Sequence, residues 1–316
     1  MRRLRTALSI IAACAIFALA ALWILTLPAV VPASALPPRT PNLANGESMF
    51  NIGGCSSCHA VPNDSPAKVD PKRLGGGLAL KSPFGTFYAP NISPDPKDGI
   101  GNWSEANFVT ALWKGTSDRG TNLYPAFPYT SYHYMRLDDV RDLFAYLKTL
   151  PPVQARSRRH ELSFPFNERR LLGAWKLLFL GEGSWAPDPT KSAQFNRGAY
   201  LVNGPGHCAE CHSPRNILGG IIESQRFAGG PAPDGDGWVP NITPFALQGG
   251  DETWSEKDIA SFLGDGMTPS GDFAGGPMAE VIRNTSLLSA EDRAAMANYL
   301  AALPPRQGPK PPPKKE

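Results

Sequence analysis

The hydrophobic pattern of this chain begins with one long apolar run near the N-terminus. Three arginines within the first five residues precede an uncharged stretch from Thr6 to Leu27, which is 22 residues long. A helix of that length spans a bilayer, whereas the apolar region of a cleaved signal usually has about 7–15 residues. The arginines favour a cytoplasmic N-terminus and export of the rest. We therefore expect residues 1–35 to form a membrane anchor, with cleavage near Ala33-Ser34-Ala35 as the alternative.

Beyond this run, apolar residues recur at helical spacing in two similar halves, which predicts a mostly α-helical protein. The inward-facing positions of the last helix are Leu137, Val140, Phe144 and Leu147 in the first half and Met296, Tyr299 and Leu300 in the second. A serine stands where the middle helix of each half should begin, Ser104 and Ser255, and serine is a favoured N-cap. Both halves therefore predict the same order of helices.

Short strings of residues repeat in the same order in both halves. The paired strings are Asn91-Ile92-Ser93-Pro94 with Asn241-Ile242-Thr243-Pro244, Trp103-Ser104-Glu105 with Trp254-Ser255-Glu256, and Asn45-Gly46-Glu47 with Arg197-Gly198-Ala199. Such self-similarity indicates two copies of one unit. We expect domains at 36–150 and 191–305, a linker at 151–190 and a disordered Pro- and Lys-rich tail at 306–316. Gly46 and Gly198 would let the first and last helix of each unit cross closely.

The composition adds a reason to expect a bound cofactor. Glycine and proline, 31 and 33 of 316 residues, make up about a fifth of the chain, which favours long ordered loops over regular sheet. Such loops fold around something, and a large apolar cofactor completes a small core. The net charge of +3 is too small to suggest a nucleic-acid partner.

Two copies of one pentapeptide identify that cofactor. Cys55-Ser56-Ser57-Cys58-His59 and Cys208-Ala209-Glu210-Cys211-His212 have the spacing that attaches c-type haem. The two thiols form thioethers with the haem, and the histidine ligates the iron. Zinc or a local disulfide would need no histidine directly after the second cysteine. Because every cysteine except Cys14 lies in these motifs, we expect two covalently attached haem c groups.

The residues around the motifs resemble those of a known family. Arg197–Val202, Gly206–Asn216 and Tyr124–Tyr129 are similar to tandem class I cytochrome c domains, and in particular to cytochrome subunits of periplasmic alcohol, gluconate and aldehyde dehydrogenases. The likeness spans residues 43–305. It implies a mostly α fold of two tandem class I cytochrome c domains after an N-terminal transmembrane helix. Those subunits usually carry three haems, and this chain has two motifs, so a close relative is indicated.

The resemblance also implies a distal methionine C-terminal to each haem motif. In the second half, Met278 lies in Gly275-Gly276-Pro277-Met278, which matches the ligand loop of the family. Met267 is the alternative, whereas Met296 is expected in the core of the last helix. We expect His212 and Met278 to ligate the second iron.

The distal ligand in the first half is less well defined. Phe127 stands where the family often has methionine, and phenylalanine cannot ligate iron. Met135 is the methionine that follows His59 in this half, so we expect His59 and Met135 to ligate the first iron. His133 and an open or water-bound site remain alternatives. An iron with a single protein ligand is open to small molecules, whereas one with two is suited to electron transfer.

We therefore expect a dihaem cytochrome c on the periplasmic side of a bacterial inner membrane, or soluble in the periplasm if the anchor is cut. It would accept single electrons from a periplasmic dehydrogenase and pass them towards a terminal oxidase or a small cytochrome. No catalytic residue is assigned. The alternative is a peroxidase-like enzyme with an open first haem and His133 as its acid/base group; a haem-based sensor is a third possibility.

Three further segments have simpler expectations. The apolar stretch Leu162–Leu180 of the linker suggests packing between the domains, with a membrane or dehydrogenase surface as the alternative. His207, next to Cys208, is expected to pack or hydrogen-bond within its loop. His160 ends the basic run from Arg156 and is expected to be solvated.

Overall fold

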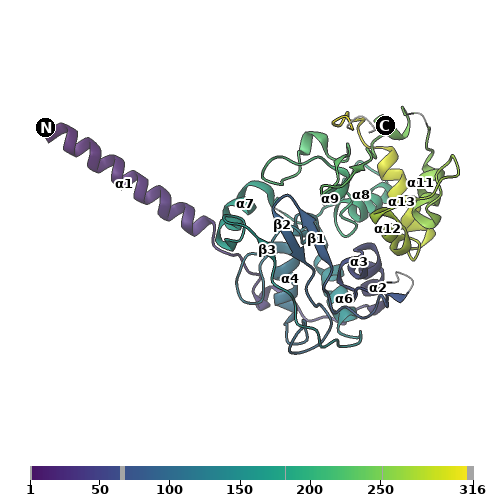
Figure 1. Ribbon diagram of the computed structural model, residues 1–316, viewed down its shortest axis with the longest axis horizontal. Coiled ribbons are helices and arrows are strands. Elements are labelled where there is room, and N and C mark those ends of the chain that lie inside the picture. Colours follow the sequence, from purple (N-terminus) through teal and green to yellow (C-terminus); the bar gives the residue numbers. More distant parts are fainter. Residues whose placement is uncertain (1, 65–67, 182, 251, 312–316) are drawn as a thin grey trace.

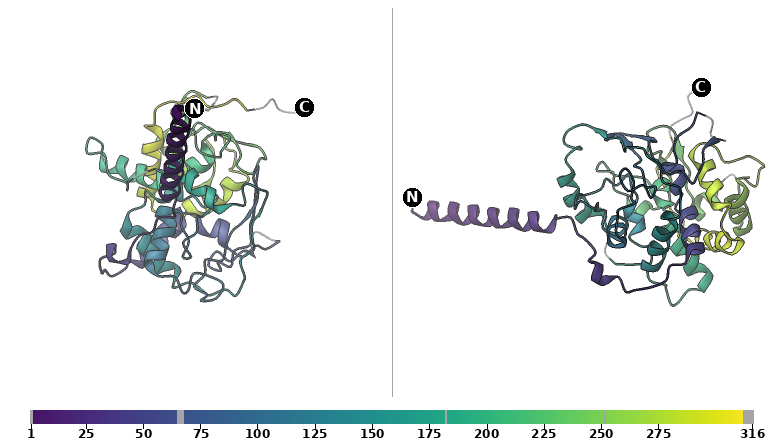
Figure 2. Two further views of the ribbon diagram at one scale, coloured as in Figure 1. Left: turned by 90° about the vertical axis from the view of Figure 1, so that its left-hand side faces the viewer. Right: turned by 90° about the horizontal axis from the view of Figure 1, so that it is seen from below.

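The computed structural model describes residues 2–64, 68–181, 183–250 and 252–311. Its first element, α1 (Arg2–Leu25), has no buried residue and projects from a globular body (Figures 1 and 2). By length and composition α1 can cross a membrane, although a signal sequence has the same properties. The predicted apolar N-terminal helix is therefore confirmed as a helix, and its retention in the membrane stays a proposal.

The globular body is mostly helical, as the hydrophobic pattern predicts. The first half contains α2 (Leu43–Ile52), α3 (Cys55–His59), β1 (Ala79–Ser82), β2 (Gly85–Tyr88), α4 (Glu105–Lys114), α5 (Tyr129–Tyr132) and α6 (Leu137–Leu147). The linker contains β3 (Glu161–Leu162), a 3-10 turn (Arg169–Leu171) and α7 (Leu172–Phe179). The second half contains α8 (Ala193–Asn203), α9 (Ala209–His212), β4 (Gly230–Pro231), β5 (Trp238–Val239), α10 (Pro244–Leu247), α11 (Glu256–Asp265), α12 (Pro277–Thr285) and α13 (Ala290–Ala301).

Each half is built around the crossing of its first and last long helices. α2 packs against α6 in the first half, and α8 packs against α13 in the second. A Cβ atom at Gly46 would overlap the carbonyl oxygen of Asp142, and one at Gly198 would overlap that of Ala295. Only glycine allows the backbones to approach this closely. The expectation of glycine-mediated crossings is confirmed in both halves.

The middle helix of each half is bounded by matching local signals. Ser104 and Ser255 accept hydrogen bonds from the backbone N–H groups of Asn107 and Asp258, and each forms a capping box. Both α4 and α11 end at a glycine in the left-handed region, which favours that residue because a Cβ would clash there. The predicted N-caps are confirmed.

The linker packs on both halves, in agreement with the expected packing between them. β3 adds to the antiparallel pair β1–β2 of the first half, and Trp175 on α7 donates from Nε1 to the Leu218 carbonyl oxygen of the second half at 2.8 Å.

The buried Lys176 of the linker donates from Nζ to the carbonyl oxygens of Lys114 and Gly115, at 2.7 and 3.1 Å, at the end of α4. The helix end leaves the Lys114 carbonyl without an intrahelical donor, and Lys176 supplies one. The Gly115 carbonyl also accepts the Leu123 backbone N–H. Burial lowers the pKa of Lys176 to about 8.

His160 shows why the expectation of a solvated basic run is wrong at that position. Its Nδ1 accepts a hydrogen bond from the Tyr88 backbone N–H at 3.1 Å, and its ring lies against Phe87 and Tyr124. Burial, followed by the charge of Arg169, lowers the pKa of His160 to about 4. Pairing of β3 with β2 draws this residue off the surface.

The start of the expected disordered tail also differs from the prediction. Asn241 donates from Nδ2 to the carbonyl oxygen of Arg306 at 2.7 Å, and the Arg306 guanidinium donates to the backbone of Glu223 and Arg226. The chain is therefore fixed against the second half as far as these contacts reach. Residues 312–316 of the expected tail lie outside the described residues.

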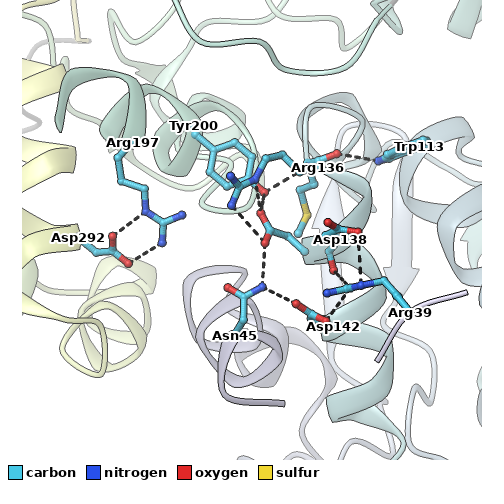
Figure 3. A network of polar contacts seen from close by, with 11 residues as sticks. Arg39, Asn45, Trp113, Arg136, Asp138, Asp142, Arg197, Tyr200 and Asp292 are labelled. Carbon is cyan, nitrogen blue, oxygen red and sulfur yellow. Dashed lines mark hydrogen bonds and ion pairs between the residues drawn. The ribbon is translucent and has the colours of Figure 1, made fainter. Parts of the chain in front are cut away.

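A buried polar network joins the two halves (Figure 3). The Tyr200 hydroxyl on α8 donates to the Asp139 carboxylate on α6. Asn45 on α2 and the Arg136 side chain also donate to that carboxylate, at 2.8 and 2.9 Å. Because Tyr200 and Asp139 are both buried, this contact ties α8 of one half to α6 of the other.

Candidate functional site

The two haem motifs form short helices that start from constrained backbone positions. Gly54 precedes α3 in the left-handed region at φ 56°, and His207, two residues before α9, has φ 39°. The cysteines of both motifs are free thiols, so the disulfide alternative has no support. Among the described residues, no three His, Cys, Asp or Glu side chains converge as a metal site would require, which disfavours the zinc alternative.

The histidine of each motif is oriented by the same second contact. His59 Nδ1 lies 2.8 Å from the Pro90 carbonyl oxygen, and His212 Nδ1 lies 2.8 Å from that of Pro240. Such a bond makes Nδ1 the donor and leaves Nε2 free to ligate a metal. Burial lowers the pKa of both imidazoles, which keeps them in the neutral form that ligation requires.

The first cysteine of each motif lies in an apolar setting. Burial raises the pKa of Cys55 and of Cys208 to about 12, so both thiols stay protonated at neutral pH. Half-buried neutral thiols beside an oriented imidazole suit a large apolar group held by thioether bonds. The donor set present in each half therefore fits haem c.

The two motifs lie against each other across the contact between the halves. His207 Nε2 and the Tyr132 hydroxyl both reach the Gly53 carbonyl oxygen, at 3.2 and 3.3 Å. The rings of Tyr132 and His207 are 5.6 Å apart between centroids. His207 therefore hydrogen-bonds, as expected, but its partner belongs to the other half rather than to its own loop.

Glu210, inside the second motif, is held by residues of the first half. Its buried carboxylate accepts hydrogen bonds from the hydroxyls of Thr130 and Ser131, at 2.7 and 2.9 Å. It also pairs with Arg215 at 2.6 Å. Burial would raise the pKa of Glu210, but the Arg215 charge and the hydrogen bonds outweigh it and hold that pKa below its usual value. Glu210 is therefore a buried anion beside Cys211.

A reciprocal contact fixes the first motif. Asn284 on α12 donates from Nδ2 to the Ser57 hydroxyl at 2.8 Å and accepts from the Ser56 hydroxyl at 3.3 Å. Each half thus offers a polar segment that follows its middle helix to the haem motif of the other half. This exchange was not foreseen from the sequence; the charged residue in the second motif, where the first has Ser57, is the one signal that a partner was needed.

The three methionines of the second half differ in how deeply they are buried. Met278 is half-buried at the start of α12 and packs against the core. Met267 is exposed and pairs with Phe273 in an isolated bridge. Met296 is buried within α13. Met278 therefore remains the strongest candidate for a distal ligand in this half.

The candidates of the first half lie in a cluster of aromatic side chains. Phe127 packs its ring against Tyr129 and Tyr132. Met135 is buried two residues before α6, and its Cγ would lie 3.9 Å from a Cβ placed at Gly204 of the second half. His133 is buried, and neither of its ring nitrogens has a hydrogen-bond partner in the described part of the chain. Its pKa is lowered, chiefly by burial.

Comparison with known proteins agrees with this geometry. A family model described as cytochrome c matches residues 43–151. A dihaem cytochrome c-type protein of Cereibacter sphaeroides is 49% identical over 286 residues, which cover 90% of this chain and 93% of that protein. The chain belongs to the cytochrome c family. Its family model covers the first haem motif, and the likeness to the Cereibacter protein extends through most of both halves.

Other cytochromes similar to this chain are longer proteins. The fructose dehydrogenase cytochrome subunit of Gluconobacter japonicus is 38% identical over 276 residues, 86% of this chain and 54% of that protein. The cytochrome c subunit of the quinone-dependent alcohol dehydrogenase of Gluconobacter oxydans is 35% identical over 271 residues, 83% of this chain and 55% of that protein. This cytochrome therefore spans about half the length of these two dehydrogenase subunits.

Proposed function

We propose that this protein is a membrane-anchored dihaem cytochrome c that carries single electrons away from a dehydrogenase. The observation that carries the proposal is the repeated motif geometry, in which His59 and His212 are each oriented by a proline carbonyl at 2.8 Å. The relatives that are named as cytochrome subunits of dehydrogenases supply the expected class of electron donor. Acceptance by a terminal oxidase or small cytochrome, on the periplasmic side, completes the proposal.

The chain would hold each haem by two cysteines and two axial ligands. Cys55, Cys58 and His59 bind the first haem, and Met135 is proposed as its distal ligand. Cys208, Cys211, His212 and Met278 form the proposed set for the second. Bound haem c supplies one-electron chemistry between Fe(III) and Fe(II). The surrounding residues exclude water and fix the ligands, so that little rearrangement accompanies a change of charge.

The contact between the motifs supports transfer of electrons within the chain. Residues flanking Cys55 and Cys208 touch directly, through His207, Tyr132 and Gly53. Because the two haem-attachment motifs are in contact, an electron would have a short path from one half to the other. A dehydrogenase could then reduce one half while an acceptor oxidises the other.

Binding of carbon monoxide to the fully reduced protein at neutral pH tests the carrier function. We expect neither haem to bind it readily, because each iron would already have two protein ligands. Met278→Leu should open the second haem and provide a positive signal. Met296→Leu is the matched control, because Met296 lies in the core of α13 and should leave the spectrum unchanged.

The same experiment addresses a second candidate function, a peroxidase-like oxidoreductase. The buried, unpartnered ring of His133 favours this candidate, because it could act as an acid/base group near an open haem. Prompt binding of carbon monoxide by the first haem of the unmodified protein would contradict Met135 as its ligand. Hydrogen peroxide turnover, lost in His133→Phe, would then replace electron carriage as the assigned function.

A further inference from the structure

The linker carries an exposed apolar surface beside the membrane helix. Phe164, Phe166, Leu171, Leu177 and Leu178, here named the linker patch, are between 46 and 79% exposed. Five large apolar side chains within 15 residues are unusual on a surface that meets only water. The carrier function does not account for them, because they do not belong to either haem motif.

The opposite face of α7 is already used for packing. Gly173 lies so close to Thr26 that a Cβ atom there would overlap the Thr26 carbonyl oxygen. Lys176, three residues on, is buried against the end of α4. Leu171 and Leu178 are seven residues apart and so share a different face of the helix.

α7 also packs on the second half, where Trp175 donates from Nε1 to the Leu218 carbonyl oxygen at 2.8 Å. These contacts with both halves leave the side chains of the linker patch exposed.

Arg170, in the 3-10 turn that precedes α7, contacts the backbone at the end of α1. The Arg170 guanidinium donates to the backbone carbonyl oxygens of Trp23, at 2.7 Å, and Thr26, and its carbon lies 4.2 Å from the centre of the Trp23 ring. Figure 1 shows α7 at the point where α1 joins the body. If α1 crosses a membrane, α7 lies where the chain leaves the bilayer.

The geometry brings the linker patch within reach of the lipid. Leu178 is five residues beyond Gly173, about 7.5 Å along the helix at the usual rise of ~1.5 Å per residue. An interfacial helix buries its apolar face about 5–10 Å into the boundary between headgroups and acyl chains. The patch is therefore close enough to the exit of α1 to enter the same boundary.

We propose that the linker patch is a second membrane contact, embedded in the surface of the bilayer that α1 spans. The bilayer is the favoured occupant because the patch is continuous with the end of the membrane helix through Arg170 and Gly173. This inference rests on the proposed retention of α1. Two points of attachment fix the body against rotation about α1, so the haem motifs keep a defined orientation to the membrane.

Cysteine reactivity in lipid nanodiscs of phosphatidylethanolamine and phosphatidylglycerol tests this contact. The full, haem-loaded chain is used with Cys14→Ser, because the motif cysteines are blocked by thioethers. Leu178→Cys is compared with Leu287→Cys, since these leucines are 68 and 66% exposed. Leu287 lies between α12 and α13. Figure 1 shows these two helices on the side of the body away from α1. A charged, water-soluble maleimide should react at least about tenfold more slowly at position 178.

The outcomes separate the contact from the anchor. The intact mass, measured first, shows whether α1 is retained. Loss of α1 would overturn the membrane anchor and the lipid contact together, and would leave the electron-carrier function standing. Retained α1 with equal rates at positions 178 and 287 would overturn the lipid contact alone. If purified dehydrogenase then slowed the reaction at position 178, the linker patch would be a protein-docking surface instead. Phe164→Cys, at another exposed patch position, should repeat the protection seen for Leu178→Cys.

Discussion

Replacement of Tyr200 by phenylalanine should weaken the junction between the two halves. The Tyr200 hydroxyl donates to the Asp139 carboxylate and accepts the Arg136 backbone N–H at 3.2 Å. Phenylalanine keeps the ring but leaves the carboxylate with Asn45 and the Arg136 side chain as donors. This contact joins Tyr200 on α8 to Asp139 on α6, and Figure 3 shows Tyr200 within the surrounding network.

The expected loss follows from the charge and burial of the acceptor. A hydrogen bond to a charged group contributes about 1.5–3 kcal/mol, and a buried group left short of a partner loses that amount. We expect Tyr200→Phe to lower the free energy of unfolding by about 2 kcal/mol. Tyr299→Phe is the matched control, because its hydroxyl accepts from the neutral Asn203 amide at 2.8 Å within the second half. That change should cost about 0.5–1.5 kcal/mol.

The pH dependence distinguishes this contact from a general loss of packing. Burial alone would raise the pKa of Asp139, but hydrogen bonds from Arg136, Tyr200 and Asn45 outweigh it and hold that pKa below its usual value. A carboxyl group with a lowered pKa in the folded state stabilises the protein above its unfolded pKa, about 3.9, and loses this contribution as the pH falls through the folded pKa. The difference between wild type and Tyr200→Phe should therefore be constant from about pH 5 to 7 and shrink below about pH 4.

Guanidinium denaturation of the haem-loaded protein, followed by haem absorbance at several pH values, measures both effects. A double-mutant cycle with Asp139→Asn isolates the pairwise energy, which should be about 1 kcal/mol or more. Either of two results would refute this reasoning. One is a loss of unfolding free energy in Tyr200→Phe no larger than that in Tyr299→Phe; the other is a loss in Tyr200→Phe that stays unchanged down to pH 3.

Three further predictions concern the haem motifs and the helix crossings. Glu210→Gln should raise the midpoint potential of the second haem in a spectroelectrochemical titration, because a buried anion favours Fe(III). Glu223→Gln is the control and should have little effect, because the Glu223 side chain is 70% exposed. Equal shifts of the potential in the two variants would contradict this role of Glu210. Gly198→Ala should destabilise the protein by several kcal/mol, because its Cβ would overlap the Ala295 carbonyl oxygen. Gly264→Ala in α11 is the control, because its Cβ would meet only the flexible Arg293 side chain, at 3.2 Å. Similar unfolding midpoints for the two variants would refute the close crossing. Excess chelator should leave both the absorbance spectrum and the stability unchanged, because covalently held haem iron is not extracted, and a loss of structure would restore the zinc alternative.

The sequence predicted features that depend on residues close together in the chain. The haem motifs, the N-caps at Ser104 and Ser255 and the helical periodicity are all read within a few residues. The close crossings at Gly46 and Gly198 were inferred from residue size, because glycine is the residue that lets two backbones touch. Family membership followed from the same local strings.

Tertiary structure decided the features that join residues far apart in the chain. Glu210 meets Thr130 and Ser131 about 80 positions away, and nothing near Glu210 specifies which hydroxyls will surround it. His160 was expected to be solvated in a basic run, but strand pairing leaves it half-buried, and burial lowers its pKa.

The apolar linker was expected to pack between the domains, with a membrane or dehydrogenase surface as the alternative. It contacts both halves, through Lys176 on Lys114 and Trp175 on Leu218, and still leaves Leu178 exposed. Local backbone preferences fix helices and motifs, whereas burial and partner choice depend on how the finished helices pack.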